Sequence, residues 1–219
     1  MPMTSITAGA VEMGNCGKML NWSYDDSTET LTISGVGNMD NYVFGNAPWA
    51  NYNVKKVIIT DRVTSIGEYA FYNCENLEKI EIGSGVNKIG KQAFAYCSSL
   101  ESITLPEGIT ELPDFVLSFC SSLSELIIPN GVISIGSNAV YACSNLCDVT
   151  IPNSVKSIGT NAFWGCESLT SVTIGPDVND IGAFAFRDTA ITSFEISEGN
   201  KAYKVQNADY IISADGTQL

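Results

Sequence analysis

Apolar residues return at a fixed interval of 23 residues through most of the chain. The phrase Ile-Gly-x-x-Ala-Phe occurs first at 66–71, and related phrases begin at Ile89, Leu112, Ile135, Ile158 and Ile181. A half unit at 54–63 fits the same frame, so the array runs from about residue 54 to 196. Repetition at one period predicts a stack of similar units, each covering the apolar face of the next.

Each unit predicts two strands and a tighter segment. In Leu100–Leu105 the apolar residues Ile103 and Leu105 alternate with a polar one, as in a strand with one buried face. The Val-x-x-Ile-Gly segment that follows favours a second short strand. The Ala-Phe-x-x-Cys segment places Phe and Cys three residues apart, which favours one or two helical turns.

The flanks of the array predict hairpins. Leu20–Tyr24 and Leu31–Ser34 are alternating runs around a polar turn at 25–29. Downstream, the run Tyr210–Ser213 leads into the turn pair Asp215-Gly216, which favours a second hairpin. The chain stops three residues after Gly216, so we expect it to be part of a longer protein.

A 23-residue unit containing L-x-x-I-x-I lies within the range of leucine-rich repeats. The predicted fold is a leucine-rich-repeat solenoid of the α/β type, mostly β with short helical turns. Its right-handed coils would carry a parallel sheet on one face, with β-hairpin caps at both ends. We expect one continuous structural domain made of an N-terminal cap at 1–53, the array at 54–196 and a C-terminal cap at 197–219.

The unit Val-x-x-Ile-Gly-x-x-Ala-Phe-x-x-Cys-x-x-Leu-x-x-Ile-x-Ile resembles the BspA-type leucine-rich repeat. The segments Cys16-Gly17, Leu31–Gly35 and Pro48-Trp49 also resemble the region that precedes such arrays, and 203–217 resembles the region that closes them. The resemblance implies a secreted or surface-anchored protein of a host-associated bacterium that takes part in adhesion. An extracellular or cell-surface location is therefore expected, although Met1–Gly17 lacks the charge and apolar run of a signal peptide.

Composition excludes several classes of function. The chain has 24 acidic and 11 basic residues, with a net charge of −13, which argues against nucleic acid or an anionic membrane as partner. No apolar run reaches the length that membrane insertion needs. The sequence contains no histidine, the commonest general base and metal ligand.

Catalysis is not predicted. The only candidate acid–base pair is Glu125 and Asp148, for which a solvated acidic patch is the better interpretation. The acidic residues at 25, 26 and 29 lack the alternating spacing of a calcium loop, so a polar turn is expected there. No cofactor and no metal site are predicted.

Five of the seven cysteines follow the 23-residue period: Cys74, Cys97, Cys120, Cys143 and Cys166. A column of parallel thiols lacks the tetrahedral convergence of a zinc site and the geometry of a good disulfide. We therefore expect a structural ladder of buried, reduced cysteines. Cys16 and Cys147 lie outside the ladder, and Cys147 is the better candidate for a reactive thiol.

The outward positions of the parallel sheet are the predicted contact surface. The partner-binding candidates are Lys56, Lys79, Glu81, Ser102, Thr104, Glu125, Ile127, Asp148, Thr150, Ser171 and Thr173. Aromatic residues after each Phe form a second patch, for which packing between coils is the favoured interpretation: Tyr72, Tyr96, Phe119, Tyr141 and Trp164.

The sequence thus predicts a non-catalytic interaction module that binds a protein of a host or neighbouring cell through its parallel-sheet face. A broad surface of small hydroxyls and graded charge suits such a contact better than a deep small-molecule site. A carbohydrate-binding module and a structural spacer that displays other domains are the alternatives.

Overall fold

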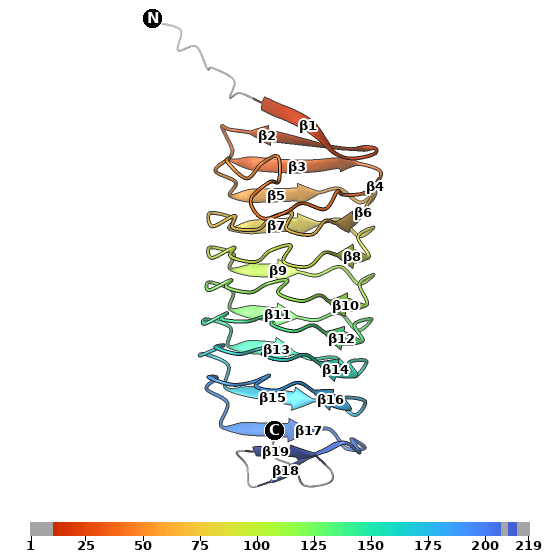
Figure 1. Ribbon diagram of the computed structural model, residues 1–219, viewed down its shortest axis with the longest axis vertical. Helices are drawn as coiled ribbons and strands as arrows, with labels where there is room; N and C mark the ends of the chain where they lie inside the picture. Colours follow the sequence, from red (N-terminus) through yellow and green to blue (C-terminus); the bar gives the residue numbers. More distant parts are fainter. Residues whose placement is uncertain (1–10, 207–209, 214–219) are drawn as a thin grey trace, which may run out of the picture.

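A computed structural model describes residues 11–206 and 210–213 as a column of stacked coils (Figure 1). The described residues form 19 strands. The N-terminal strands are β1 (Val11–Gly17), β2 (Leu20–Asp25), β3 (Thr30–Gly35) and β4 (Gly37–Asn38). The C-terminal pair is β18 (Tyr203–Gln206) and β19 (Tyr210–Ser213).

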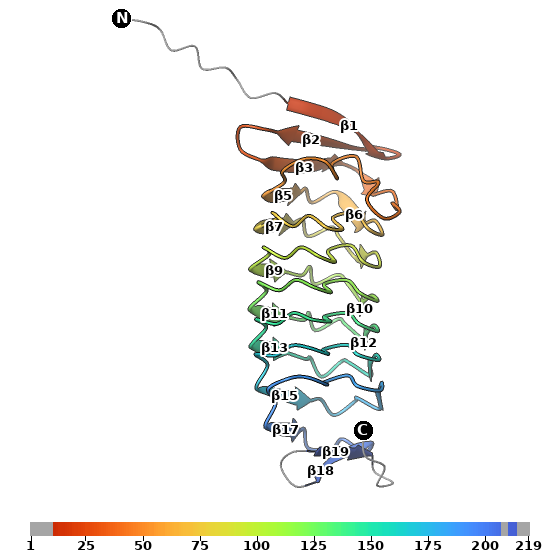
Figure 2. The same cartoon turned by 60° about the vertical axis from the view of Figure 1, so that its left-hand side comes forward.

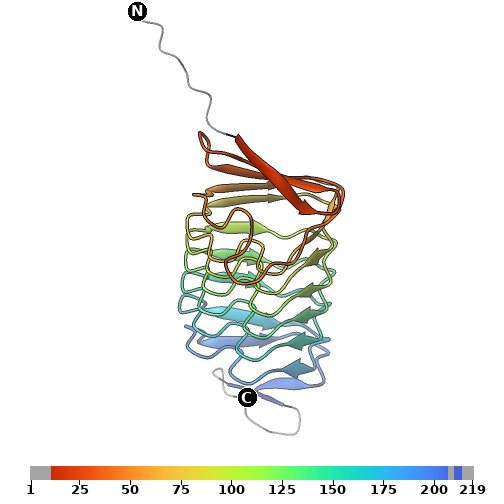
Figure 3. The same cartoon turned by 45° about the horizontal axis from the view of Figure 1, so that its top comes forward.

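Each coil has a side of longer strands and a side of shorter ones, joined by turn segments (Figure 3). The longer strands are β5 (Lys56–Ile59), β7 (Lys79–Ile82), β9 (Ser102–Thr104), β11 (Glu125–Ile127), β13 (Asp148–Thr150), β15 (Ser171–Ile174) and β17 (Ser193–Ile196). The shorter strands are β6 (Val63–Ile66), β8 (Lys88–Ile89), β10 (Glu111–Leu112), β12 (Ser134–Ile135), β14 (Ser157–Ile158) and β16 (Asp180–Ile181).

The longer strands form the parallel-sheet face. Pairing is parallel along β3–β5–β7, β9–β11–β13 and β15–β17, with Glu125 opposite Asp148 and Leu126 opposite Val149. Leu126 and Val149 point into the core, while their neighbours face outward. The predicted parallel-sheet solenoid is confirmed, because alternation along each strand buries the apolar side chains and exposes the polar ones between them.

The prediction of helical turns is wrong. The Ala-Phe-x-x-Cys segments, here called the turn side, are overlapping turns with a left-handed residue near each end, such as Tyr69 (φ 55°) and Asn73 (φ 59°). An α-helix is about 10 Å wide, so it cannot repeat at a spacing of about 4.8 Å, which direct hydrogen bonds between coils impose on the turn side as well as on the strands.

The turn conformation instead directs alternate N–H groups at the next coil. Phe71 N donates to Ala93 O at 2.8 Å, and Asn73 N donates to Ala95 O at 2.8 Å. Equivalent bonds recur through the array, so the turn side carries its own hydrogen-bond ladder between coils. Each coil is therefore bonded to its neighbours on the turn side as well as through its strands.

Glycine in the Ile-Gly pair allows this close stacking. A Cβ on Gly90 would lie 2.4 Å from Glu68 N, and one on Gly159 would lie 2.5 Å from Ser137 N. Real Cβ atoms do not approach backbone that closely, so most copies keep glycine at this point. The third copy is an exception, because Pro113 carries a Cβ and lacks the N–H that Gly90 donates to Ile66 O at 2.9 Å, so it forgoes one bond between coils.

The N-terminal cap extends the sheet. The predicted hairpin is present as β2 and β3, which pair antiparallel, and β3 then pairs parallel with β5 (Figure 2). Strand β1 pairs with β2 and was not predicted, because most of its side chains are exposed and it lacks apolar alternation. Trp49 is fully buried under the cap and donates Nε1–H to Ala70 O at 2.7 Å.

The C-terminal cap is an antiparallel pair of β18 and β19. Its Tyr203 hydroxyl accepts the Ile181 N–H at 2.9 Å, which covers the end of the shorter-strand side. The predicted turn at Asp215-Gly216 lies outside the described residues.

The periodic cysteines lie inside the coil. Cys97, Cys120, Cys143 and Cys166 are fully buried, and each thiol donates to a carbonyl of the preceding coil at 3.1–3.2 Å. Burial raises the pKa of Cys120 and Cys166 to about 12. Cys74, on the first rung, is half-buried, whereas Cys147 is exposed.

The turn-side ladder predicts a sharp contrast in amide exchange within the last coil. The N–H groups of Phe184, Phe186 and Asp188 have no backbone acceptor within 11–206 and 210–213, unlike Ala185 and Arg187, which bond within their own turns. We expect the first three amides to exchange much faster than their two neighbours in hydrogen-exchange NMR. Equal protection of all five would contradict the ladder.

Thiol labelling should separate the cysteines. With iodoacetamide at mildly alkaline pH, we expect the native protein to gain a rapid adduct at Cys147 and to react at Cys97, Cys120, Cys143 and Cys166 only after unfolding. Burial keeps the reagent away from the ladder thiols, and because it also raises their pKa it keeps them in the unreactive thiol form. Mass spectrometry of Cys147→Ser serves as the control, and rapid modification of Cys120 in the folded protein would refute the prediction.

Candidate functional site

The predicted contact residues all lie on the parallel-sheet face. Strand register places them in two neighbouring columns, and all are exposed except Lys56, which is half-exposed. The first column runs through Lys56, Lys79, Ser102, Glu125, Asp148 and Ser171. The second runs through Glu81, Thr104, Ile127, Thr150 and Thr173.

The sequence predicts a change from basic to acidic charge along the first column, but part of the basic charge is neutralised within the sheet. Lys56 Nζ lies 2.6 Å from Glu81 Oε1, so the first cation of the column is paired within the sheet. Thr173 Oγ1 bonds Glu195 at 3.2 Å near the other end. Lys79 has no carboxylate partner within 4.0 Å among the described residues and is the basic group left for a partner at this end.

The middle of the face combines an acidic pair with an exposed apolar side chain. Glu125 and Asp148 are directly opposite in register, and neither forms an ion pair within the described chain. Like charges in opposite positions repel across a sheet. Ile127, from the same strand as Glu125, is 60% exposed and has threonines opposite it on both sides.

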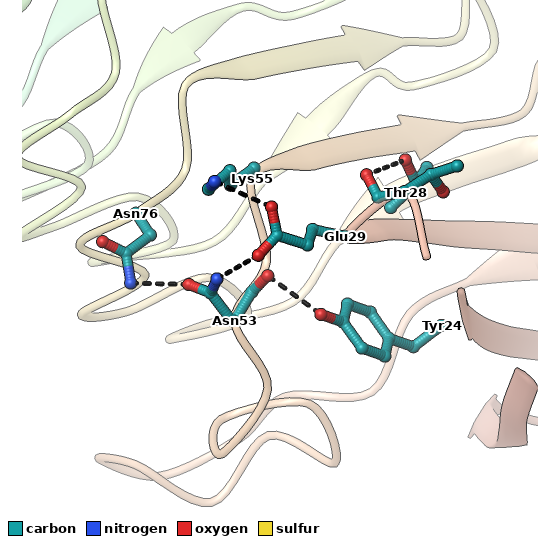
Figure 4. Close-up of polar contacts among 7 residues, drawn as sticks. Tyr24, Thr28, Glu29, Asn53, Lys55 and Asn76 are labelled. Carbon is teal, nitrogen blue, oxygen red and sulfur yellow. Dashed lines mark hydrogen bonds and ion pairs between the residues drawn. The ribbon is translucent and has the colours of Figure 1, made fainter. Parts of the chain in front are cut away.

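A separate polar network joins the N-terminal cap to the first coil (Figure 4). Glu29 forms an ion pair with Lys55 at 2.8 Å and accepts a hydrogen bond from Asn53, which in turn accepts one from Asn76 at 2.7 Å. The Lys55 contact holds the pKa of the Glu29 carboxyl below its ordinary value. Because these groups satisfy one another, the network stabilises the join and offers little to a ligand.

The hollows along the surface are small and lie at the edges of the coils. One of about 310 Å³ is lined by 50–54 and 73–76, and another of about 300 Å³ lies beside Lys91 and Asp114. Lys91 Nζ lies 2.8 Å from Asp114 Oδ2, so these two charges neutralise each other and are not free to bind a ligand. Two further hollows, of about 510 Å³ beside Asp177 and about 360 Å³ beside Asn38, likewise lack the contact residues of the parallel-sheet face, which is an open surface at these positions.

The second sequence candidate, the aromatic patch, forms a continuous column on the turn side. Its rings, here called the outer aromatic column, are Phe44, Tyr72, Tyr96, Phe119, Tyr141, Trp164 and Phe184, with successive centroids 4.4–5.9 Å apart. The rings do contact one another between coils, as expected, yet all remain at least partly exposed. Phe44 and Phe184 extend the column at its two ends and were missed, because Phe44 precedes the array and Phe184 lies at a third repeat position, that of Tyr69.

Within 11–206 and 210–213, no group of three or more Cys, Asp or Glu side chains could hold a metal ion. The same residues include no helix of sufficient length and apolar character to span a bilayer.

Known structures share this architecture. A leucine-rich cell-surface protein of Faecalibacterium prausnitzii A2-165 is 29% identical with a TM-score of 0.75, over 92% of this chain and 59% of that one. A leucine-rich repeat protein of T. pallidum is 26% identical with a TM-score of 0.57, over 76% of this chain and 84% of that one. The pneumococcal vaccine antigen PcpA is 21% identical with a TM-score of 0.65, over 95% of this chain and 55% of that one, and shares the fold.

The chain therefore spans 59% of the length of the Faecalibacterium protein. A search of curated proteins finds no match. The family model described as the BspA type leucine-rich repeat region, with six copies, matches residues 38–146 and 134–208. With its parallel-sheet coils, this chain belongs to the BspA-type leucine-rich repeat family.

Proposed function

We propose that this protein is a non-catalytic binding module of the cell surface that engages a protein of a host or neighbouring cell through its parallel-sheet face. The observation that carries the proposal is the centre of that face, where Glu125, Asp148 and Ile127 are exposed side by side on a rigid sheet. The Faecalibacterium relative is described as a cell-surface protein, which supports the same location here.

The acidic pair of Glu125 and Asp148 favours a basic partner. Two carboxylates opposite each other cost the folded protein stability, and no cation of the described chain offsets this. A Lys or Arg of a partner would relieve the repulsion, while Ile127 would bury apolar area at the centre of the contact. The expected partner surface is therefore basic and flat, with an apolar centre.

A catalytic role has little support. The carboxylate pair lies on an open strand surface, where water reaches both groups, and the chain has no histidine to act as a general base. Enzyme sites are enclosed because water weakens the electrostatic interactions that stabilise a transition state.

Binding to a panel of extracellular proteins and to a glycan array tests the proposal. We expect saturable binding to a basic protein, weakened about tenfold by the double variant Glu125→Gln with Asp148→Asn and weakened by added salt. Ile127→Ser should lower affinity without changing the salt dependence.

The matched control is Glu107→Gln with Asp177→Asn, which removes two exposed carboxylates away from this face. It should leave binding unchanged. Binding to glycans alone would favour the carbohydrate module, and absence of binding to both arrays would favour the spacer. A protein partner that is indifferent to all three sheet substitutions would overturn the proposed face.

A further inference from the structure

The outer aromatic column is built from two alternative positions in the repeat. In each inner coil one ring occupies the position directly after the buried Phe, or after its counterparts Leu117 and Val140, or the position after that, and the other position is not aromatic. Tyr72, Tyr141 and Trp164 use the first position, beside Asn73, Ala142 and Gly165. Tyr96 and Phe119 use the second, beside Ala95 and Ser118. Each inner coil therefore contributes one ring from these two positions, and the contacts continue without a gap, with Tyr69 as a further ring 5.6 Å from Tyr72.

The core does not require these rings. Phe71, Phe94 and Phe163 are fully buried inside the coils, and the first two already stack across coils at 5.4 Å. The outer column is separate and exposed, with Phe44 at 69%, Tyr96 at 36% and Phe184 at 55%. A contiguous exposed aromatic surface marks an interaction site.

The column is electrically neutral on a chain of net charge −13. Among the described residues its only cation contact is Arg187, whose guanidinium lies 5.0 Å from the Trp164 ring centroid. Asp188 accepts the Trp164 Nε1–H at 2.7 Å and lies 3.8 Å from Arg187 Nε, so the local charges balance. Charge complementarity therefore selects an uncharged ligand, unlike the basic partner expected at the sheet face.

The spacing of the rings selects the conformation of that ligand. Coils are about 4.8 Å apart, so every second ring repeats after about 9.6 Å. A polyproline II helix repeats after three residues of about 3.1 Å, or about 9.3 Å. Such a segment lying along the column would present the same face to every second ring, with little drift over the length of the array.

The polar edge of the column has matching chemistry. The hydroxyls of Tyr96 and Tyr141 have no hydrogen-bond partner in the described part of the chain. Carbonyl oxygens of a polyproline II segment make no internal hydrogen bonds and can accept from such donors. Aromatic surfaces bind proline-rich segments in this way because the ligand loses little conformational entropy.

We propose that the outer aromatic column is a second interaction surface, which binds an uncharged proline-rich segment of a partner protein in the polyproline II conformation. The surface lies on the turn side and shares no residue with the parallel-sheet face. One partner can therefore bind the parallel-sheet face while a proline-rich segment binds the outer aromatic column.

A blocked oligoproline peptide of about ten residues, which spans about three helical turns, is the probe. We expect a saturable change in tryptophan fluorescence, because Trp164 is half-exposed in the column while Trp49 is fully buried. A glycine–serine peptide of equal length should produce no saturable change, since it lacks the preformed helix.

The test variant is Tyr96→Asn with Phe119→Ala, residues that this chain itself places at the same repeat position in Asn73 and Ala142. All four positions have positive φ, so the replacements suit the backbone. We expect oligoproline affinity to fall about tenfold or more, with the circular dichroism spectrum unchanged.

The sheet variant Glu125→Gln with Asp148→Asn is the matched control and should bind oligoproline like the wild type. The two proposals therefore fail separately, since each double variant affects one ligand. Absence of saturable oligoproline binding, binding unaffected by the aromatic variant, or preference for a neutral oligosaccharide over the peptide would each overturn this inference.

Discussion

The spacing between successive coils is the constraint on which the rest of the structure depends. Backbone hydrogen bonds set it through the strands and again through the turn side, where Phe71 N meets Ala93 O. At about 4.8 Å per coil, no helix can be accommodated and a Cβ at Gly90 would meet backbone. The same spacing places each periodic side chain next to its copies in the neighbouring coils. Residues 23 apart in the sequence therefore form columns along the solenoid, such as the column of thiols.

The ladder also has a direction, so the two ends of the solenoid need different chemistry. The turn-side N–H groups point toward the C-terminal end, which leaves carbonyls at the first coil and donors at the last. At the first coil, Trp49 donates to Ala70 O and Tyr42 N donates to Glu68 O. At the last coil, Tyr203 supplies an acceptor for Ile181 N on the shorter-strand side. The N-terminal cap thus supplies donors to the carbonyls of the first coil. The C-terminal cap meets the last coil on the shorter-strand side and leaves the N–H groups of Phe184, Phe186 and Asp188 without a backbone acceptor in the described chain.

Much of this could be predicted from the sequence because the period determines which residues are neighbours. The opposition of Glu125 and Asp148 follows from an interval of 23 residues alone. The turn side could not be predicted in the same way. A Phe and a Cys three residues apart fit a helix as well as they fit the observed turns. Only the spacing between coils on the turn side, which the sequence does not reveal, excludes the helix. Strand β1 was missed because its pairing with β2 depends on backbone bonds and not on apolar alternation.

The aromatic column shows why contact surfaces are harder to predict than the fold. All five array rings are visible in the sequence, but Tyr72, Tyr141 and Trp164 use one repeat position while Tyr96 and Phe119 use the next, so their continuous contact follows only from the stacked coils. The core tolerates either arrangement, since the buried Phe71 and Phe94 stack regardless. What is maintained is at least one surface ring for each coil in contact with the rings of its neighbours, a property of the assembled column and not of any single repeat. In a solenoid the strict period accounts for stability, so surface features that persist while the period shifts are the better guide to binding.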